Sequence, residues 1–435
     1  METLLLIANL VITWRVLALN GASPNSIASI YVSGCLLSLY ILTGLELSKE
    51  MLFFTAMPIN DYEETALSVY AVYTLINLIS YAVSPRKRAA AGRAERSAAA
   101  SVKLASLRMP VSIEAALLAI FTLLSVVNIA HFMSMDYSTL LSNDLYLTVK
   151  TPEAIGIRND LMAVYHKLIR FIGASAVIVL CESLYQRRHA VSLVTALYLA
   201  YCILIMATGA SRWICVYAAL AAGFVLIRKP PGYRAIATAL IAVTFFCFVF
   251  VLLGRSSGAY GLSHLGTYMD AFSFEMMPTY ISGVAVNVFE GAFNLANSLQ
   301  LDATFDPWYV RHSFLPLFSF MDGFNENVPQ FAWKFAPNVP MSAISETYLF
   351  GPSFFMAYIA MYATSLRLSV MVYQRSEVPF ILKMALMAPM YYVVLAQHTY
   401  SLRTIIKPSL LIIVVFIIVL VSFKRKNSQD EPNHP

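Results

Sequence analysis

Long apolar runs recur from one end of this 435-residue chain to the other. A helix needs about 20 apolar residues to cross a hydrocarbon core about 30 Å thick, and most of the runs are close to that length. Helices are the expected element, because lipid offers no partner for an unbonded backbone amide. We predict an all-α, polytopic transmembrane protein with about eleven spans (ten to twelve), over residues 3–19, 27–45, 65–83, 112–134, 162–185, 190–208, 211–228, 235–253, 345–365, 379–397 and 404–423.

Composition excludes an ordinary soluble globule. Hydrophobic residues make up 59% of the chain and charged residues only 12%, against roughly 25% charged in soluble domains. The first apolar run, Leu4 to Leu19, has no basic stretch before it and no small-residue cleavage site after it. We therefore expect it to be the first span and not a removable signal peptide.

Basic residues predict the orientation, since short cytoplasmic loops carry the excess of Lys and Arg. The densest group lies in an Ala- and Ser-rich stretch, 84–108, which we expect to be a cytoplasmic linker. The alternation of spans then puts the amino end outside and the carboxyl end inside. Further basic residues fall on the same inner side: Arg187, Arg188, Arg228, Lys229, Arg234, Arg367, Arg375, Lys383, Lys424, Arg425 and Lys426.

The spans define a domain organisation. Residues 1–253 would hold the first eight spans, 346–423 the last three, and 424–435 a cytoplasmic tail. Between them lies a segment of about 90 residues, 254–345, and structureless loops of that length are uncommon. We expect this outer segment to be partly helical and to carry function.

The positions of the cysteines and the lack of metal-binding and phosphate-binding motifs lead us to expect no cofactor. All five cysteines lie inside apolar runs, which is typical of small buried hydrophobic residues and not of a disulfide framework: Cys35, Cys181, Cys202, Cys215 and Cys247. The sequence contains neither a Gly-rich phosphate loop nor an H-E-x-x-H zinc motif. The basic residues follow the cytoplasmic ends of spans as topology requires, so nothing indicates nucleic-acid binding.

The outer segment combines aromatic rings with carboxylates and amides, as in the stretch from Asp306 to His312. Ring faces can cover the apolar face of a sugar while polar groups bond its hydroxyls. An interfacial belt of Trp and Tyr explains the same composition without any ligand. Both readings stay open at this point.

Outward-facing cations predict an anion site. Arg212, Arg255, Arg311, Arg403 and Lys407 all fall near the outer ends of predicted spans or in the outer segment. Together they could bind one phosphate or pyrophosphate, which suits the planar guanidinium fork. Each alone could instead extend to lipid headgroups.

Two of these arginines share a glycine spacing. Gly223 follows Arg212 by eleven residues, and Gly266 follows Arg255 by eleven. Eleven residues are close to three helical turns, so Gly223 would lie below Arg212 on one helix face and let a neighbouring helix approach. The residues after Arg255 are loop-like, and the same explanation does not extend to Gly266.

These features resemble those of the O-antigen polymerases (Wzy type), which extend lipid-linked polysaccharide in Gram-negative bacteria. The resemblance rests on the span layout with one large outer segment, the paired Arg–Gly elements, and the run SAISETYLFGPSFF at 342–355. That run matches the family's Glu, aromatic and Gly pattern at the start of a late span, here Glu346, Tyr348 and Gly351. The layout covers nearly the whole chain, whereas the motifs are short.

The resemblance implies a glycosyltransferase in the bacterial inner membrane with a periplasmic active site. The growing glycan would leave its undecaprenyl pyrophosphate and join a newly arrived lipid-linked repeat unit, without a nucleotide sugar, cofactor or metal. Arg212, Arg255, Arg311, Arg403, Lys407, Gly223, Gly266 and Tyr348 are then the candidate substrate-binding residues. A chain-length regulator protein is a possible partner.

The acceptor hydroxyl needs a base. Glu346 is the first candidate, because burial at the outer end of a span would raise its pKa, and His312 is the second. An acid favoured by a helix N-terminus and a plain loop histidine are the alternative readings. Related ligases place a His-Asn pair before the late span, and the stretch NVPMSAISE has no His, so the identity of the base is open.

Two other functions share the lipid ligand and the helical layout. An O-antigen ligase is the nearer one, and the sequence separates it poorly from a polymerase. A flippase or transporter for lipid-linked oligosaccharide is the other. Transporters usually show internal repeats and charges near mid-membrane, neither of which stands out in this sequence.

Overall fold

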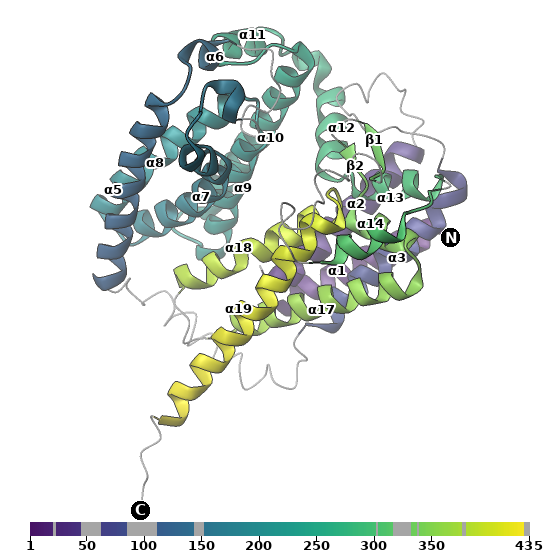
Figure 1. Ribbon diagram of the computed structural model, residues 1–435. Coiled ribbons are helices and arrows are strands. Elements are labelled where there is room, and N and C mark those ends of the chain that lie inside the picture. Colours follow the sequence, from purple (N-terminus) through teal and green to yellow (C-terminus); the bar gives the residue numbers. More distant parts are fainter. Residues whose placement is uncertain are drawn as a thin grey trace, which may run out of the picture. The chain divides into compact units, whose positions relative to one another are not determined.

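The computed structural model describes residues 1–20, 23–44, 62–84, 111–142, 152–301, 303–315, 332–336, 339–375 and 380–429. The predicted linker 84–108, apart from Ser84, and the end of the tail lie outside this part of the chain. Nine helices within it are long and apolar enough to cross a membrane. They are α1 (Glu2–Asn20), α2 (Pro24–Gly44), α3 (Glu63–Ala82), α5 (Val111–Met133), α7 (Asp160–Tyr185), α8 (His189–Thr208), α10 (Tyr233–Ser257), α17 (Pro352–Tyr373) and α19 (Leu402–Gln429) (Figure 1).

These helices confirm an all-α membrane protein at the level of fold class. The two remaining predicted spans coincide with shorter helices, α9 (Trp213–Arg228) with 16 residues and α18 (Phe380–Ala396) with 17. The total of about eleven spans stays a prediction, because a helix of about 20 residues is what a full crossing requires.

The ninth span was placed wrongly. The predicted range 345–365 joins two helices, the short α16 (Ala343–Leu349) and the long α17. Gly351 separates them with a φ of +113°, a conformation that favours glycine, and Pro352 then opens α17. Hydropathy could not detect this break because Tyr348, Leu349 and Phe350 are all apolar. Glu346 therefore lies in α16, ahead of the span.

The predicted outer segment does contain helices. They are α11 (Leu265–Asp270), α12 (Met277–Val288), α13 (Gly291–Leu299), α14 (Pro307–Phe314), α16 and the single 3₁₀ turns η5 (Leu262–His264) and η6 (Phe274–Met276). The strands β1 (Lys334–Ala336) and β2 (Val339–Pro340) form one small antiparallel pair. Elsewhere, α6 (Tyr137–Leu141) and η4 (Pro152–Ile155) lie between α5 and α7. Capping explains α14, since Asp306 accepts from the Trp308 amide at 2.7 Å.

The chain divides into two compact units. The terminal unit comprises Met1–Val102 and Ala285–Pro435, and the central unit comprises Lys103–Val284. The boundary between Val284 and Ala285 divides the outer segment 254–345 between the two units, whereas we predicted it as one region.

In the central unit, α7 and α9 run in the same direction and are joined at both ends. At one end the Tyr217 hydroxyl donates to the Arg170 carbonyl at 3.0 Å. At the other end Arg228 donates to both carboxylate oxygens of Glu182, with Nε 3.0 Å from Oε2. Twelve residues separate Arg170 from Glu182, or about 18 Å along the helix. The two contacts therefore fix the register of α7 against α9.

The Arg228–Glu182 pair supports a prediction on stability. Its side chains are 7% and 2% exposed, so removing either partner leaves a buried, uncompensated charge. We expect Glu182→Ala to lower the free energy of unfolding by about 3–5 kcal/mol. Glu114→Ala is the matched control, because the Arg188–Glu114 pair is 30% and 23% exposed and should contribute at most about 1 kcal/mol. Unfolding in detergent measures both, and equal losses would contradict the prediction.

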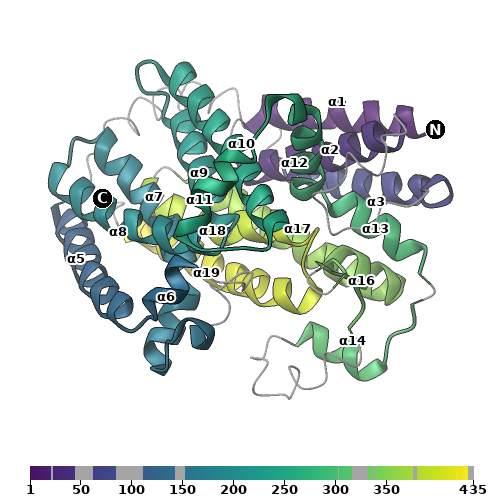
Figure 2. The ribbon, with the colours of Figure 1, turned by 90° about the horizontal axis from the view of Figure 1, so that it is seen from above.

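In the terminal unit, α1, α2 and α3 lie side by side (Figure 2) and share buried polar groups. Asn77 of α3 donates to the Asn9 side chain of α1 at 2.9 Å, and Thr13 of α1 bonds Ser33 of α2 at 2.6 Å. Interhelical hydrogen bonds of this kind help helices to associate in lipid, where the hydrophobic effect does not drive one helix against another.

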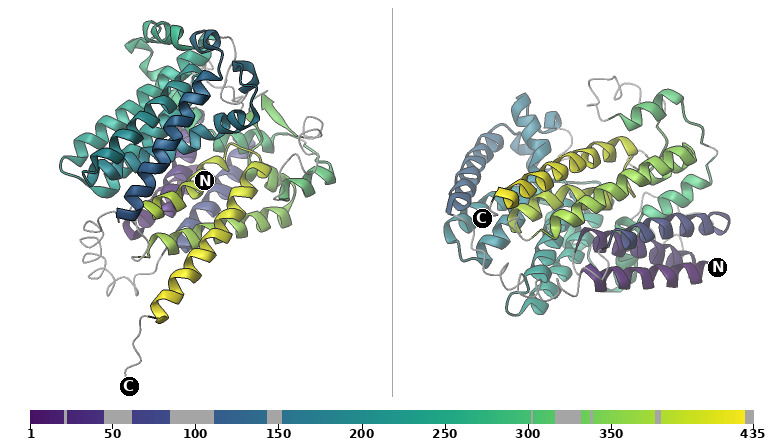
Figure 3. Two further views of the ribbon diagram at one scale, coloured as in Figure 1. Left: turned by 60° about the vertical axis from the view of Figure 1, so that its left-hand side comes forward. Right: turned by 90° about the horizontal axis from the view of Figure 1, so that it is seen from below.

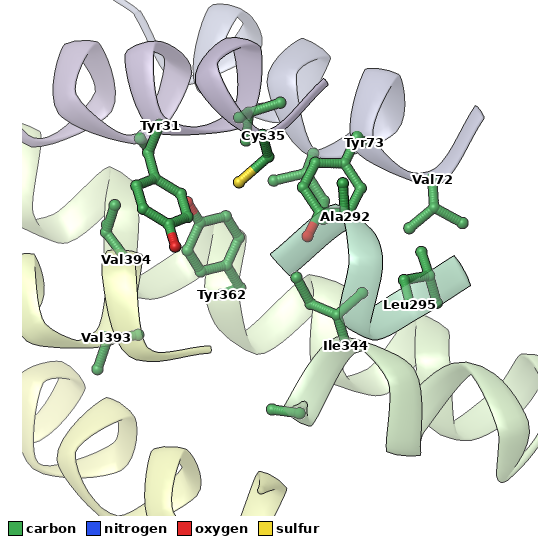
Figure 4. Packing of buried hydrophobic residues seen from close by; sticks show 14 of the residues in the cluster. Tyr31, Cys35, Val72, Tyr73, Ala292, Leu295, Ile344, Tyr362, Val393 and Val394 are labelled. Carbon is green, nitrogen blue, oxygen red and sulfur yellow. The ribbon is translucent and has the colours of Figure 1, made fainter. Parts of the chain in front are cut away.

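The rest of the terminal unit packs on this bundle. The paired helices α17 and α19 are seen side by side in Figure 3. Figure 4 shows the buried core, in which Tyr31 and Cys35 of α2, Tyr73 of α3 and Tyr362 of α17 come together with side chains of α13, α16 and α18. All five cysteines are free thiols, three of them buried and two partly buried, as the prediction of small buried hydrophobic residues requires.

Candidate functional sites

The central unit gathers three arginines around the start of α9. Arg170 lies in α7, Arg212 directly precedes α9, and Arg255 lies in the last turn of α10. We call these three residues the arginine cluster. The turn from α8 into α9 sets the place of Arg212: Ala210 has a φ of +44°, and the Ser211 amide donates back to the Met206 carbonyl at 3.0 Å.

The surroundings of the three guanidinium groups show that they share one region. The Arg170 Cζ atom lies 4.9 Å from the centre of the Phe171 ring and 6.0 Å from that of Trp213, the first residue of α9. Arg212 and Arg255 both act electrostatically on the Cys215 thiol, and Arg170 acts on the Tyr217 hydroxyl. Because Coulomb attraction falls with distance, all three charges lie around the first turns of α9.

This arrangement suits an anion with several charges. All three arginines are half-buried, so they are partly shielded from water yet reachable. Guanidinium groups bind phosphate oxygens through paired N–H donors. The positive end of the dipole of the 16-residue helix α9 lies beside Arg212, the residue that precedes the helix.

The two glycines of the Arg–Gly elements lie where no helix approaches them closely within the described part of the chain. Within the described part of the chain, a Cβ added at Gly223 or at Gly266 would have no atom within 4 Å. Among the described residues, then, the prediction that Gly223 admits a neighbouring helix is wrong, and Gly266 is exposed in α11. The close approaches are at Gly173, where an added Cβ would overlap the Tyr217 hydroxyl, and at Gly254, where it would lie 3.0 Å from the Tyr268 ring.

In the terminal unit, Glu346 connects α14, α16 and α19. Its Oε1 atom accepts from the Tyr309 hydroxyl at 2.7 Å, and its Oε2 atom accepts from the Leu402 amide at 2.6 Å. Leu402 is the first residue of α19, so the carboxylate caps that helix. Glu346 is only 1% exposed. Both of its oxygens are thus engaged in holding helices together.

Arg403 completes the same junction. Its Nη1 atom donates to the His312 carbonyl and, at 2.8 Å, to the Leu315 carbonyl at the end of α14. The guanidinium therefore satisfies backbone acceptors that end the helix. We call Tyr309, Glu346, Leu402 and Arg403 the junction.

His312 lies on the last turn of α14, beside the junction. Its Nδ1 atom is 2.8 Å from the Trp308 carbonyl, and a carbonyl only accepts, so Nδ1 carries the proton of this bond. In the neutral ring Nε2 is then an acceptor. The imidazole stacks on the Trp308 ring at 4.1 Å between centres. His312 is half-buried, so its orientation is fixed while part of the ring faces outward.

The remaining candidates lie around this junction. Arg311 is exposed on α14, and Lys407 is half-buried in α19. Tyr348 packs its ring edge against Phe355 at 5.6 Å. The sequence predicts that the outward-facing cations bind one anion together. Two of them, Arg212 and Arg255, belong to the central unit, and the other three belong to the terminal unit: Arg311, Arg403 and Lys407. A single site formed by all five therefore stays a prediction.

Burial raises the pKa of Glu346 to about 7, against hydrogen bonds from Tyr309 and Leu402 that lower it. The folded protein therefore binds this proton more tightly than the unfolded chain, whose carboxyl titrates near 4.5. The stabilisation that the protonated Glu346 carboxyl contributes to the fold is complete below pH 4.5 and is lost as the pH rises to about 7.

A glutamine at this position tests the pH dependence, because Gln resembles the protonated form of Glu346. The melting temperature of Glu346→Gln minus that of wild type should rise between pH 4.5 and about 7. A constant difference from pH 4 to 8 would refute this prediction.

Sequence reasoning did not select several buried or half-buried polar residues as candidates. Arg170 sits within an apolar run, and a cation there is a signal that could have been used. His131 and His166 share that signal: they bond each other at 3.0 Å between Nε2 and Nδ1 and are at most 1% exposed. Tyr309 carries no such signal. Among the residues that the structure describes, no three His, Cys, Asp or Glu side chains gather as metal ligands.

No protein-family model matches the chain, and searches of curated proteins and of solved structures return no match either. The chemistry of the arginine cluster and of the junction is what bears on function.

Proposed function

We propose that the protein transfers a glycan from a lipid pyrophosphate to the next lipid-linked repeat unit, as an O-antigen polymerase of the bacterial inner membrane with its reaction at the periplasmic face. The observation that carries this proposal is the arginine cluster around the start of α9. A leaving pyrophosphate gains negative charge as it departs, and preformed cations stabilise that charge in the transition state.

The transfer itself makes and breaks one glycosidic bond. The bond from the donor's anomeric carbon to the pyrophosphate oxygen breaks, and its electron pair leaves with the lipid pyrophosphate. The acceptor hydroxyl oxygen bonds the anomeric carbon, and its proton passes to a base. Of the two predicted bases, His312 has the chemistry for this role, because its Nδ1–H donates to the Trp308 carbonyl and its Nε2 atom can accept. Glu346 bonds Tyr309 of α14 and the start of α19 and is not assigned contact with substrate.

A deletion strain tests the proposal against its alternatives. Loss of the lipopolysaccharide ladder with a single repeat unit retained on the lipid core is the expected result for a polymerase. Loss of all O-antigen, including that single unit, would indicate a ligase or a flippase instead. A plasmid copy of the wild-type chain should restore the ladder. An unchanged ladder in the deletion strain would refute all three functions.

A further inference from the structure

The loop after α10 lies across the end of the central unit that carries the arginine cluster. It turns at Gly258 and Gly261, with φ of +69° and +107°, and continues into η5 and α11. The Gly261 amide donates to the Thr208 carbonyl at the end of α8, at 3.0 Å. Only glycine fits here, because an added Cβ would overlap the Leu141 carbonyl. We call residues 258–264 the strap.

Two further bonds hold the strap. The Ser263 hydroxyl donates to the Leu141 carbonyl at 2.6 Å, and the Ser142 hydroxyl lies 3.0 Å from Nε2 of His264. With Ser142 as the donor, the neutral imidazole of His264 keeps its proton on Nδ1. The two ring nitrogens point away from each other, so this N–H is directed away from Ser142. His264 is half-buried.

Residues on both sides of His264 in the sequence contact the helix ends next to Arg212 and Arg255. Three residues before it, Gly261 bonds Thr208, which is four residues ahead of Arg212. Four residues after it, Tyr268 packs on Gly254, the neighbour of Arg255. Gly254 also lies close to Ala210 in the turn before Arg212. The strap thus places the imidazole of His264 at the same end of the unit as Arg212 and Arg255.

We propose that His264 is a further binding residue for the lipid pyrophosphate, donating from Nδ1 to the phosphate that is farther from the lipid. This inference rests on the proposed function, since it takes the arginine cluster to hold the phosphate nearer the lipid. Ser142 acts by fixing the imidazole tautomer. A second N–H donor set apart from the arginines would let the site distinguish a pyrophosphate from a monophosphate.

Binding of farnesyl pyrophosphate and farnesyl monophosphate to the purified full-length protein in detergent tests the inference. We expect His264→Ala to weaken pyrophosphate binding about tenfold, as for one lost hydrogen bond to a charged group, and to leave monophosphate binding unchanged. His264→Asn should retain much of the affinity, because its side-chain N–H lies near the position of Nδ1. His189→Ala is the matched control, an exposed histidine at the opposite end of α8.

The outcomes separate the two proposals. Arg212→Ala should weaken both ligands. If it does so while His264→Ala binds both ligands like wild type, the role of His264 is refuted and the arginine site stands. If His264→Ala weakens both ligands equally, the histidine does not select the second phosphate and the inference fails. If Arg212→Ala binds farnesyl pyrophosphate like wild type, the proposed function fails. Melting temperatures of the variants show whether each one is folded.

Discussion

Replacing Arg212 by alanine should abolish long glycan chains while leaving the amount of protein in the membrane unchanged. Removing one preformed donor from a site that stabilises developing negative charge costs about 10²–10³ in rate. A polymer ladder needs many successive transfers, so a loss of that size shortens the chains to one or a few units. Arg170→Ala should have the same effect, since Arg170 lies beside Trp213 in the same cluster.

Two variants make this experiment specific. Arg158→Ala is the matched control, because Arg158 is exposed and lies twelve residues before Arg170; its ladder should be normal. Arg212→Lys keeps the charge but loses the planar fork and should give an intermediate ladder. Wild-type ladders in both Arg170→Ala and Arg212→Ala would show that the cluster has no part in the transfer. Immunoblots of membrane fractions report the protein level.

The helices were predictable because their signal is local. A run of about 20 apolar residues implies a spanning helix whatever surrounds it, and α10 covers the predicted range 235–253 with four further residues at its carboxyl end. Arg255, which falls in the predicted outer segment 254–345, therefore lies in the last turn of α10. The ends of helices depend on single residues such as Gly351, and average hydropathy does not report them.

The contacts that form the sites were not predictable, because they join residues far apart in the chain. Tyr309 and Glu346 are 37 residues apart, and Arg403 bonds the carbonyl of His312 across 91. A single sequence can nominate Glu346, His312 and Arg403 by residue type. It cannot show that the Glu346 carboxylate is occupied by Leu402 and Tyr309, and this fact alone changes the role assigned to Glu346.

Arg403 and Arg212 illustrate the same limit of prediction from a single sequence. Arg403 is buried, and two carbonyls at the end of α14 accept from its guanidinium, whereas Arg212 lies half-buried at the start of α9. In the sequence, both arginines lie near the outer end of a predicted span. Their surroundings assign Arg403 to the structure of the junction and Arg212 to anion binding in our proposal.

The division of roles between His312 and Glu346 leads to the second large effect. If His312 accepts the acceptor's proton, His312→Ala should lower the rate of glycan transfer by about 10²–10⁴, the usual contribution of a positioned base. Glu346→Gln should retain most of the activity, because a carboxamide can still accept from Leu402 and meet the Tyr309 hydroxyl. Glu346→Ala should instead lower stability, since the Tyr309 hydroxyl and the Leu402 amide would be left buried without their acceptor.

Transfer rates with lipid-linked repeat units and purified protein separate the two residues. The rate should fall in His312→Ala and stay near that of wild type in Glu346→Gln. Trp308→Phe is a useful companion variant, because it keeps the carbonyl that holds Nδ1 and changes only the stacked ring. Complete loss of transfer in a folded Glu346→Gln variant, with His312→Ala near wild type, would return the role of base to Glu346. Its pKa near 7 would then be the property that qualifies it.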